Sequence, residues 1–141
     1  MRALLVRHAS AGNRRAWSVD DRLRPLDGTG RQQAKALAAT LATLGADRLL
    51  SSPCQRCLET LEPTAQRLGL PIESREEIAE GASVAEVRSL LAELDGSLPA
   101  LSTHGDVVEA LLPGRKCKKG GIWVVDVFGG DVRPERYLPP A

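Results

Sequence analysis

Short apolar segments alternate with longer amphipathic segments along almost the whole chain, and this alternation limits the possible folds more than any other feature. Apolar, partly β-branched runs predict strands at residues 3–7, 48–52, 72–73, 98–103, 122–127 and 132–138. Recurrence of Ala, Leu and Val at helical spacing predicts helices over residues 28–44, 53–68, 84–94 and a short segment before Pro113. This order predicts an α/β sandwich with a mostly parallel sheet flanked by helices. Pro134 cannot donate a ladder hydrogen bond, so the last strand is expected at an edge.

Residues that begin or end helices support these boundaries. Asp27 is a predicted N-cap for the first helix, and Gly45 is its predicted C-terminal stop. Pro53 is predicted to open the second helix, because proline is tolerated at the first helical position. Ser83-Val84-Ala85-Glu86 fits the capping-box pattern, and Asp106 is a candidate cap for the short fourth helix.

Length and composition indicate one globular unit. We expect residues 1–141 to form a single domain, since 141 residues is an ordinary domain length. Hydrophobic residues make up 43% and charged residues 26% of the chain, which excludes a disordered protein. Only 3% of residues are aromatic, so the core is expected to be aliphatic.

Net charge, apolar segment length and cysteine content indicate the class of partner and the compartment. The net charge is +1, which gives no reason to expect a nucleic-acid polymer as partner. Residues 1–70 carry 11 Lys and Arg against 6 Asp and Glu, which fits a small anionic ligand better. No segment approaches the roughly 20 apolar residues of a membrane helix, so no membrane partner is expected. Three cysteines without an export signal predict a cytoplasmic protein.

Polar residues of an unusual kind follow three of the predicted strands. The first strand ends in Arg7-His8, the second in Ser51-Ser52 with Arg56 shortly after, and the fourth in Thr103-His104-Gly105. A lone histidine or arginine at such a place is more often a structural or solvated residue. In open α/β sheets, however, ligands bind beyond the carboxyl ends of strands, so these groups are expected to converge. Two histidines with two arginines, and no metal-ligand set, fit a phosphoryl group.

Four motifs in chain order resemble those of a known family. They are Arg7-His8-Ala9, residues 24–34, Ser51-Ser52-Pro53-Cys54-Gln55-Arg56, and Thr103-His104-Gly105. They look like the motifs of the histidine phosphatase (phosphoglycerate-mutase-like) superfamily, and the match runs from residue 3 to about residue 112. The chain length and the final Tyr137-Leu138-Pro139-Pro140 resemble the compact SixA-type phosphohistidine phosphatases. The resemblance implies the histidine phosphatase fold.

The resemblance also implies a role for each matching residue. His8 would be the nucleophile that forms a covalent phosphohistidine. Arg7 and Arg56 would hold the phosphoryl oxygens. His104 would donate to the phosphate and balance charge in the transition state, and Gly105 would contribute to phosphate binding at the start of its helix.

Larger members of the family use a glutamate to protonate the leaving group. Glu80 is the best match for that residue, with Glu77 as its rival and a solvated acidic loop over residues 73–80 as an equal alternative. Ser10 and Arg14 are further candidates for substrate binding.

Two positions depart from the family pattern. Ala9 stands where glycine is usual, and a positive φ there would strain the backbone by about 1 kcal/mol. Ser10-Ala11-Gly12-Asn13 does not fit the longer motif of mutases, which argues against a mutase.

We therefore expect a metal-independent phosphatase without a cofactor, acting through a phosphohistidine on His8. The first hypothesis is a SixA-type protein phosphohistidine phosphatase. Phosphatase activity on small phosphomonoesters or nucleotides, held by Arg14, Arg15 and Arg22, is the alternative. A different class is an inactive module that binds phosphorylated partners. Residues 17–34 also resemble the phosphatase half of bacterial proteins that join a Nudix domain to this fold.

The C-x-x-C formed by Cys54 and Cys57 suggests zinc or thiol chemistry at first sight. Zinc needs about four ligands, and Cys117 stands alone, so no metal site is expected. Cys57 shares the apolar helix face with Leu58 and Leu61 and is expected to pack. Cys54 lies in the first turn near Arg56, which predicts a peroxide-reactive thiolate.

Overall fold

The computed structural model describes residues 1–141 and contains one six-stranded sheet in the order β3-β2-β4-β1-β5-β6. The strands are β1 (Arg2–Arg7), β2 (Arg48–Ser51), β3 (Ile72–Ser74), β4 (Pro99–Thr103), β5 (Ile122–Phe128) and β6 (Asp131–Leu138). Strands β3, β2, β4 and β1 are parallel, whereas β5 and β6 add in antiparallel pairs. The predicted mostly parallel α/β sheet is confirmed.

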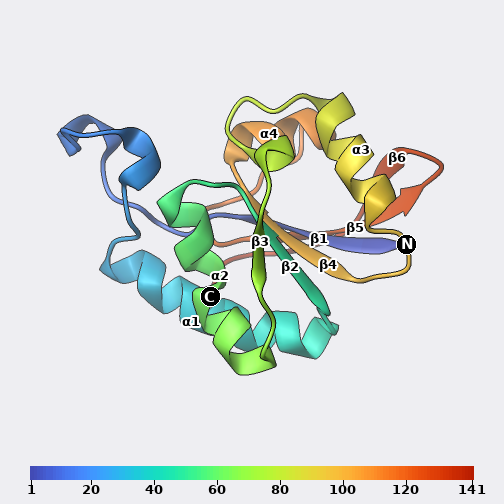
Figure 1. Ribbon diagram of the computed structural model, residues 1–141, viewed down its shortest axis with the longest axis horizontal. Helices are drawn as coiled ribbons and strands as arrows, with labels where there is room; N and C mark the ends of the chain where they lie inside the picture. Colours follow the sequence, from blue (N-terminus) through green and yellow to red (C-terminus); the bar gives the residue numbers. More distant parts are fainter.

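Four helices cover the sheet, two on each face (Figure 1). They are α1 (Gly28–Leu44), α2 (Gln55–Leu68), α3 (Val84–Glu93) and α4 (Gly105–Leu111). Three short 3-10 turns lie in the loops: η1 (Arg14–Ala16), η2 (Asp21–Leu23) and η3 (Glu76–Ile78). No helix in the structure combines the length and the apolar character that a membrane crossing requires.

The core consists of two aliphatic layers because successive strand residues face opposite sides of the sheet. Leu4 and Leu49 pack in one layer with Leu41 of α1. Their neighbours Leu5 and Leu50 pack in the other layer with α3 and α4. Burying each such side chain stabilises the fold by roughly 1.5–3 kcal/mol. Because neighbouring residues of one strand pack against different helices, the same strands hold both helix layers.

Several predicted helix ends are confirmed by their hydrogen bonds. The Asp27 carboxylate caps α1 by accepting from the Gly30 backbone N–H at 2.7 Å, and Gly45 ends α1 at φ 86°. Ser83 and Glu86 form both bonds of the predicted capping box of α3. These local signals therefore set the bounds of α1 and the start of α3.

The predicted start of the second helix is wrong by two residues. Pro53 lies before α2, whose N-cap is Cys54 in an extended conformation. The Ser52 N–H still bonds the Ser102 carbonyl at 2.9 Å, so β2 continues to pair with β4 up to that point. The chain turns into the helix only after this tertiary hydrogen bond.

The predicted cap of the fourth helix is also wrong. His104, not Asp106, is the N-cap of α4, and its carbonyl accepts from Val108 to close the first turn. The Asp106 carboxylate instead accepts from the Gly81 N–H at 2.9 Å, across the loop before α3.

Strand β6 forms an edge of the sheet, as Pro134 predicted. Its pairing with β5 shifts register beside the proline, where Val124 faces Arg136 and Val125 faces Pro134. The irregularity accommodates the residue that has no N–H to donate.

The carboxyl ends of β1, β2 and β4 lie together at one edge of the sheet. These strands are adjacent and parallel, so the residues that follow them are brought close to each other. Residues 10–26 leave this edge and extend beyond the body of the molecule (Figure 1, upper left).

Candidate active site

His8 and His104 face each other directly beyond two paired strands. Arg7 of β1 is in register with Thr103 of β4, and the His8 N–H bonds the Thr103 carbonyl at 2.9 Å. The two imidazole rings are therefore 5.5 Å apart, at 68° to each other. Both side chains are largely buried, yet both line the same cavity.

The His8 ring is held in one tautomer. Its Nδ1 lies 2.8 Å from the Ala9 carbonyl oxygen. A carbonyl only accepts, so Nδ1 carries the proton and Nε2 keeps its lone pair. Burial, with smaller contributions from the neighbouring Arg56 and His104, lowers the pKa of His8 to about 3. At neutral pH the ring is uncharged, with a free nucleophilic nitrogen.

Ala9 causes no strain. No non-glycine residue in the chain has a positive φ, so the expected cost at this position is absent. The residue is fully buried, and its N–H donates to Thr60 Oγ1 at 3.0 Å.

The His104 ring is anchored on one side only. Its Nε2 lies 2.8 Å from Ser52 Oγ and 3.6 Å from Cys57 Sγ. Its Nδ1 is buried without a hydrogen-bond partner, 3.6 Å from Glu80 Oε2. Burial, together with the charge of Arg56, lowers the pKa of His104 to about 4. A buried nitrogen without a partner is the kind of group that a ligand satisfies.

Arg56 is completely buried between two carboxylates. Its Nη2 lies 3.0 Å from Glu80 Oε2 and 3.2 Å from Asp21 Oδ2, and its Nη1 donates to the Asp21 carbonyl at 2.9 Å. Asp21 also binds Arg24 at 2.9 Å and Arg14 at 3.4 Å. The sequence prediction missed Asp21, and the only available signal was that a buried arginine needs a counter-charge.

Arg7 lies across the start of α4. A Cβ atom on Gly105 would lie 2.9 Å from the Arg7 guanidinium carbon, so only glycine allows this approach. Arg7 Nη1 donates to the Cys117 carbonyl at 2.8 Å, while its buried Nε has no partner. Gly105 is thus placed at the site, as predicted, and leaves room for the guanidinium.

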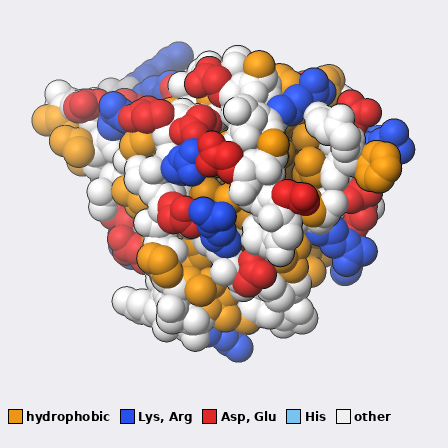
Figure 2. All heavy atoms as spheres, turned by 45° about the vertical axis from the view of Figure 1, so that its right-hand side comes forward, with side chains coloured by type: hydrophobic (Ala, Val, Ile, Leu, Met, Phe, Trp, Pro, Cys, Tyr) orange, Lys and Arg blue, Asp and Glu red, His pale blue; other side chains and the backbone are white.

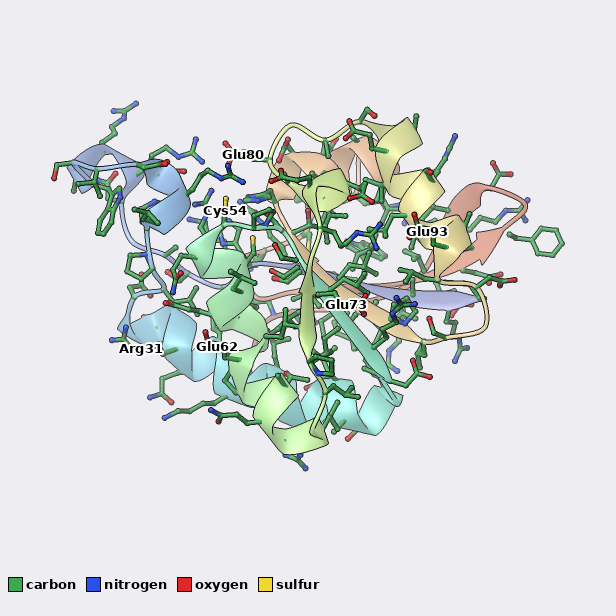
Figure 3. All side chains as sticks on the ribbon, viewed as in Figure 1. Arg31, Cys54, Glu62, Glu73, Glu80 and Glu93 are labelled. Carbon is green, nitrogen blue, oxygen red and sulfur yellow. The ribbon has the colours of Figure 1, made fainter.

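The structure separates the two candidate acids. Glu80 lines the cavity and binds Arg14 at 2.9 Å (Figure 3). Glu77 instead pairs with Arg75, away from the cavity. Arg14 also lines the cavity, but the Ser10 hydroxyl does not, because it donates to Asp27 at 2.7 Å.

The cavity has a volume of about 1530 Å³ and a lining with a net positive charge. Seven Lys and Arg side chains line it, against three Asp and Glu. Arg15 and Arg22 are not among them, and Arg22 pairs with Glu76. Sequence reasoning missed the contribution of residues 115–119, whose four cations belong to this lining. On the face seen in Figure 2, by contrast, basic and acidic side chains are interspersed.

All three cysteines are free thiols. Cys57 is fully buried and packs as predicted, and burial raises its pKa to about 12. Cys54 is only 5% exposed at the start of α2 (Figure 3), so peroxide has little access to it and the predicted reactivity has no support from this position. No three His, Cys, Asp or Glu residues are grouped to hold a metal ion.

Comparison with known proteins shows the family of this chain. The family model of the histidine phosphatase superfamily (branch 1) matches residues 3–93. An 8-oxo-(d)GTP phosphatase of Mycolicibacterium smegmatis (strain ATCC 700084 / mc(2)155) is 36% identical over 153 residues, which cover 97% of this chain and 48% of that protein. The chain thus spans about half the length of that relative.

Solved structures show the same fold. The protein histidine phosphatase SixA complexed with tungstate aligns with a TM-score of 0.82 and 26% identity, over 99% of this chain and 97% of that one. A mycobacterial glucosyl-3-phosphoglycerate phosphatase aligns with a TM-score of 0.76 and 16% identity, over 99% of both chains. The chain therefore belongs to the histidine phosphatase superfamily (branch 1), a family of phosphatases, and has the compact fold of its SixA-type members.

Proposed function

We propose that the protein is a metal-independent phosphatase that forms a covalent phosphohistidine on His8. The observation that carries the proposal is the His8 ring itself: it lines the cavity, its Nδ1–H is fixed by the Ala9 carbonyl, and its Nε2 is left unprotonated. A neutral imidazole nitrogen with a fixed direction is a competent nucleophile toward phosphorus.

In the first step, Nε2 of His8 attacks the phosphorus atom and the bond to the leaving oxygen breaks. Negative charge on the transferred oxygens needs nearby donors. Arg7 Nε, Arg56 Nε and His104 Nδ1 are three of the four buried side-chain atoms that lack a hydrogen-bond partner. A phosphoryl group supplies the acceptors that these three nitrogen atoms need.

His104 can serve as a donor in its neutral form. Ser52 Oγ accepts from the Cys54 N–H at 3.4 Å, which leaves the serine proton free for His104 Nε2. Nδ1 then carries the ring proton and can donate it in a hydrogen bond to a phosphoryl oxygen. In this role His104 orients and stabilises the transferred group.

Glu80 is the acid that we assign to the leaving group. Its carboxyl group lies in the cavity near His104 and is tied to Arg14 and Arg56. Glu80 takes up the proton of a substrate phosphate monoanion and passes it to the departing oxygen. Water then attacks the phosphohistidine and loses a proton to the Glu80 carboxylate, the bond between Nε2 and phosphorus breaks, and phosphate and free His8 are released. A phosphoramidate substrate has a labile bond and depends less on this acid.

Two substrate classes have support. Likeness to SixA and an open cavity support phosphohistidine in proteins. The 36% identical 8-oxo-(d)GTP phosphatase and the cationic lining support small phosphate esters. An inactive binding module has less support, because His8, Arg7 and His104 all line one cavity and Arg56, which does not line it, is bonded to Glu80 of that lining.

The test is to trap the intermediate. Protein mixed with a ³²P-labelled phospho-donor in EDTA and quenched in alkali is expected to retain acid-labile phosphate. The His8→Asn variant should retain none, and Arg15→Ala, which changes an exposed arginine outside the cavity, should label like the parent. Absence of labelled phosphate in an active parent protein, or a His8→Asn variant that keeps most of the turnover, would overturn the proposal.

A further inference from the structure

We propose that residues 115–119, here called the basic segment, form a second anion site in the same cavity, and that the substrate is a small phosphate ester carrying a second phosphate, such as a nucleoside diphosphate. This inference rests on the proposed phosphatase function and selects between its two substrate classes. Arg115, Lys116, Lys118 and Lys119 of the basic segment all line the cavity that holds His8 and His104.

The basic segment is fixed to the strand that carries the nucleophile. Arg7 Nη1 donates to the Cys117 carbonyl at 2.8 Å. Just after the segment, the Gly120 N–H donates to the Arg7 and His8 carbonyls at 3.0 and 3.2 Å. The position of the segment's backbone relative to His8 is therefore set by direct hydrogen bonds.

Further hydrogen bonds hold the backbone of the basic segment. The Lys118 N–H donates to Tyr137 Oη at 3.0 Å, and Trp123 Nε1 donates to the Lys116 carbonyl at 2.9 Å. The Arg115 guanidinium lies 5.9 Å from the centre of the Trp123 ring. A backbone that is already held in place loses little freedom when an anion arrives, which favours binding.

None of these four cations forms an ion pair within 4 Å. Arg14 and Arg56 are neutralised by Glu80 and Asp21, but no ion pair involves a residue of the basic segment. Partial burial and the charges of Arg7 and Arg24 lower the pKa of Lys119, against the opposing effect of Asp27. A single phosphoryl group at His8 leaves this excess charge uncompensated, whereas a second phosphate neutralises it.

A small ligand fits these facts better than an acidic protein. The cations line the wall of the catalytic cavity together with Arg7, which borders both sites. Cavities of about 300–1,000 Å³ are large enough for drug-sized ligands. This cavity is larger, so it has room for a molecule with two phosphates. One molecule can thus present one phosphate to His8 and another to the basic segment.

The test compares ADP with p-nitrophenyl phosphate, which has a single phosphate. In the variant Lys118→Ala/Lys119→Ala, kcat/KM for ADP is expected to fall at least about tenfold, and for p-nitrophenyl phosphate less than about threefold. The control is Arg133→Ala/Arg136→Ala, which removes two exposed, unpaired cations of β6 that lie outside the cavity. This control should leave both substrates unchanged.

A binding measurement separates failure of this inference from failure of the phosphatase proposal. By calorimetry, the His8→Asn protein should bind pyrophosphate at least about tenfold more tightly than phosphate, and the double lysine variant should lose this preference. Equal binding of the two anions, or equal loss for both substrates, overturns the second anion site even if the enzyme is active. A lysine effect confined to an acidic phosphohistidine peptide also overturns it and assigns the segment to a protein partner.

Discussion

Ser52 Oγ and His104 Nε2 are joined by a 2.8 Å hydrogen bond that links the ends of β2 and β4. Both residues are almost completely buried. The bond fixes the direction of the His104 ring and turns its free Nδ1 toward Glu80, 3.6 Å away. A serine at the end of one strand thus orients a histidine at the end of the next.

Replacing Ser52 by alanine should lower kcat about tenfold with a smaller change in KM, because Nε2 would lose its partner and the ring its orientation. Unfolding in urea should show a loss of about 1–3 kcal/mol. Ser51→Ala is the matched control, since Ser51 is equally buried and bonds only the Ser52 carbonyl at 2.8 Å. An equal fall in kcat for both variants would contradict the orienting role of Ser52.

His8 should make the protein less stable in acid. Its pKa is about 3 when folded and 6.5 when unfolded, so the unfolded chain takes up a proton first as the pH falls. Stability is therefore complete above pH 6.5 and is lost progressively down to about pH 3. At pH 5 the loss from this residue is about 2 kcal/mol. Between pH 7.5 and 5, the free energy of unfolding in urea should fall by about 2 kcal/mol less in His8→Asn than in the parent protein. An equal fall in both proteins would refute this assignment.

Glu80→Gln should distinguish substrates by their leaving groups. An alkyl phosphate needs a proton on its departing oxygen, so kcat/KM for it should fall about 100-fold. p-Nitrophenyl phosphate has a good leaving group and should be affected far less. Glu77→Gln serves as the control, because Glu77 pairs with Arg75 outside the cavity. A uniform loss for both substrates would indicate that Glu80 only positions Arg56.

Gly105→Ala should displace the Arg7 guanidinium. The added methyl would lie 2.9 Å from Arg7 Cζ, and a shift of that group weakens its hold on phosphate. A fall in kcat/KM of about 10–100-fold is expected, with phosphate inhibition weakened in parallel. Gly28→Ala is the control, since its new methyl meets only ordinary contacts at the start of α1. Normal phosphate inhibition in Gly105→Ala would exclude this explanation.

Much of the fold was predictable because it depends on local patterns. Alternation in β1 and β2 buries Leu4 and Leu5 on opposite faces, and the helical spacing in α1 and α3 is marked by caps at Asp27 and Ser83. The two errors at helix starts have one cause. The first residues of α2 and α4 are set by hydrogen bonds to other strands and loops, which no local sequence pattern predicts.

The site was predictable where residues follow adjacent parallel strands, as with His8 and His104. It was not predictable where the placement depends on long-range contacts. Asp21 reaches Arg56 from a loop that extends away from the sheet. The basic segment reaches Arg7 because antiparallel pairing of β5 with β1 brings a turn near Gly120 back to the end of β1.

Strand β1 lies between β4 and β5, so the strand that leads into His8 is hydrogen-bonded to a neighbouring strand on each side. The loops around it, residues 10–26 and the basic segment, are not strands of the sheet. The nucleophile and the loops that surround it thus occupy separate parts of the architecture. Loop exchange or insertion should alter which compounds are accepted long before it disturbs the distance between the two imidazoles, which makes this small scaffold a suitable starting point for redirecting phosphate hydrolysis.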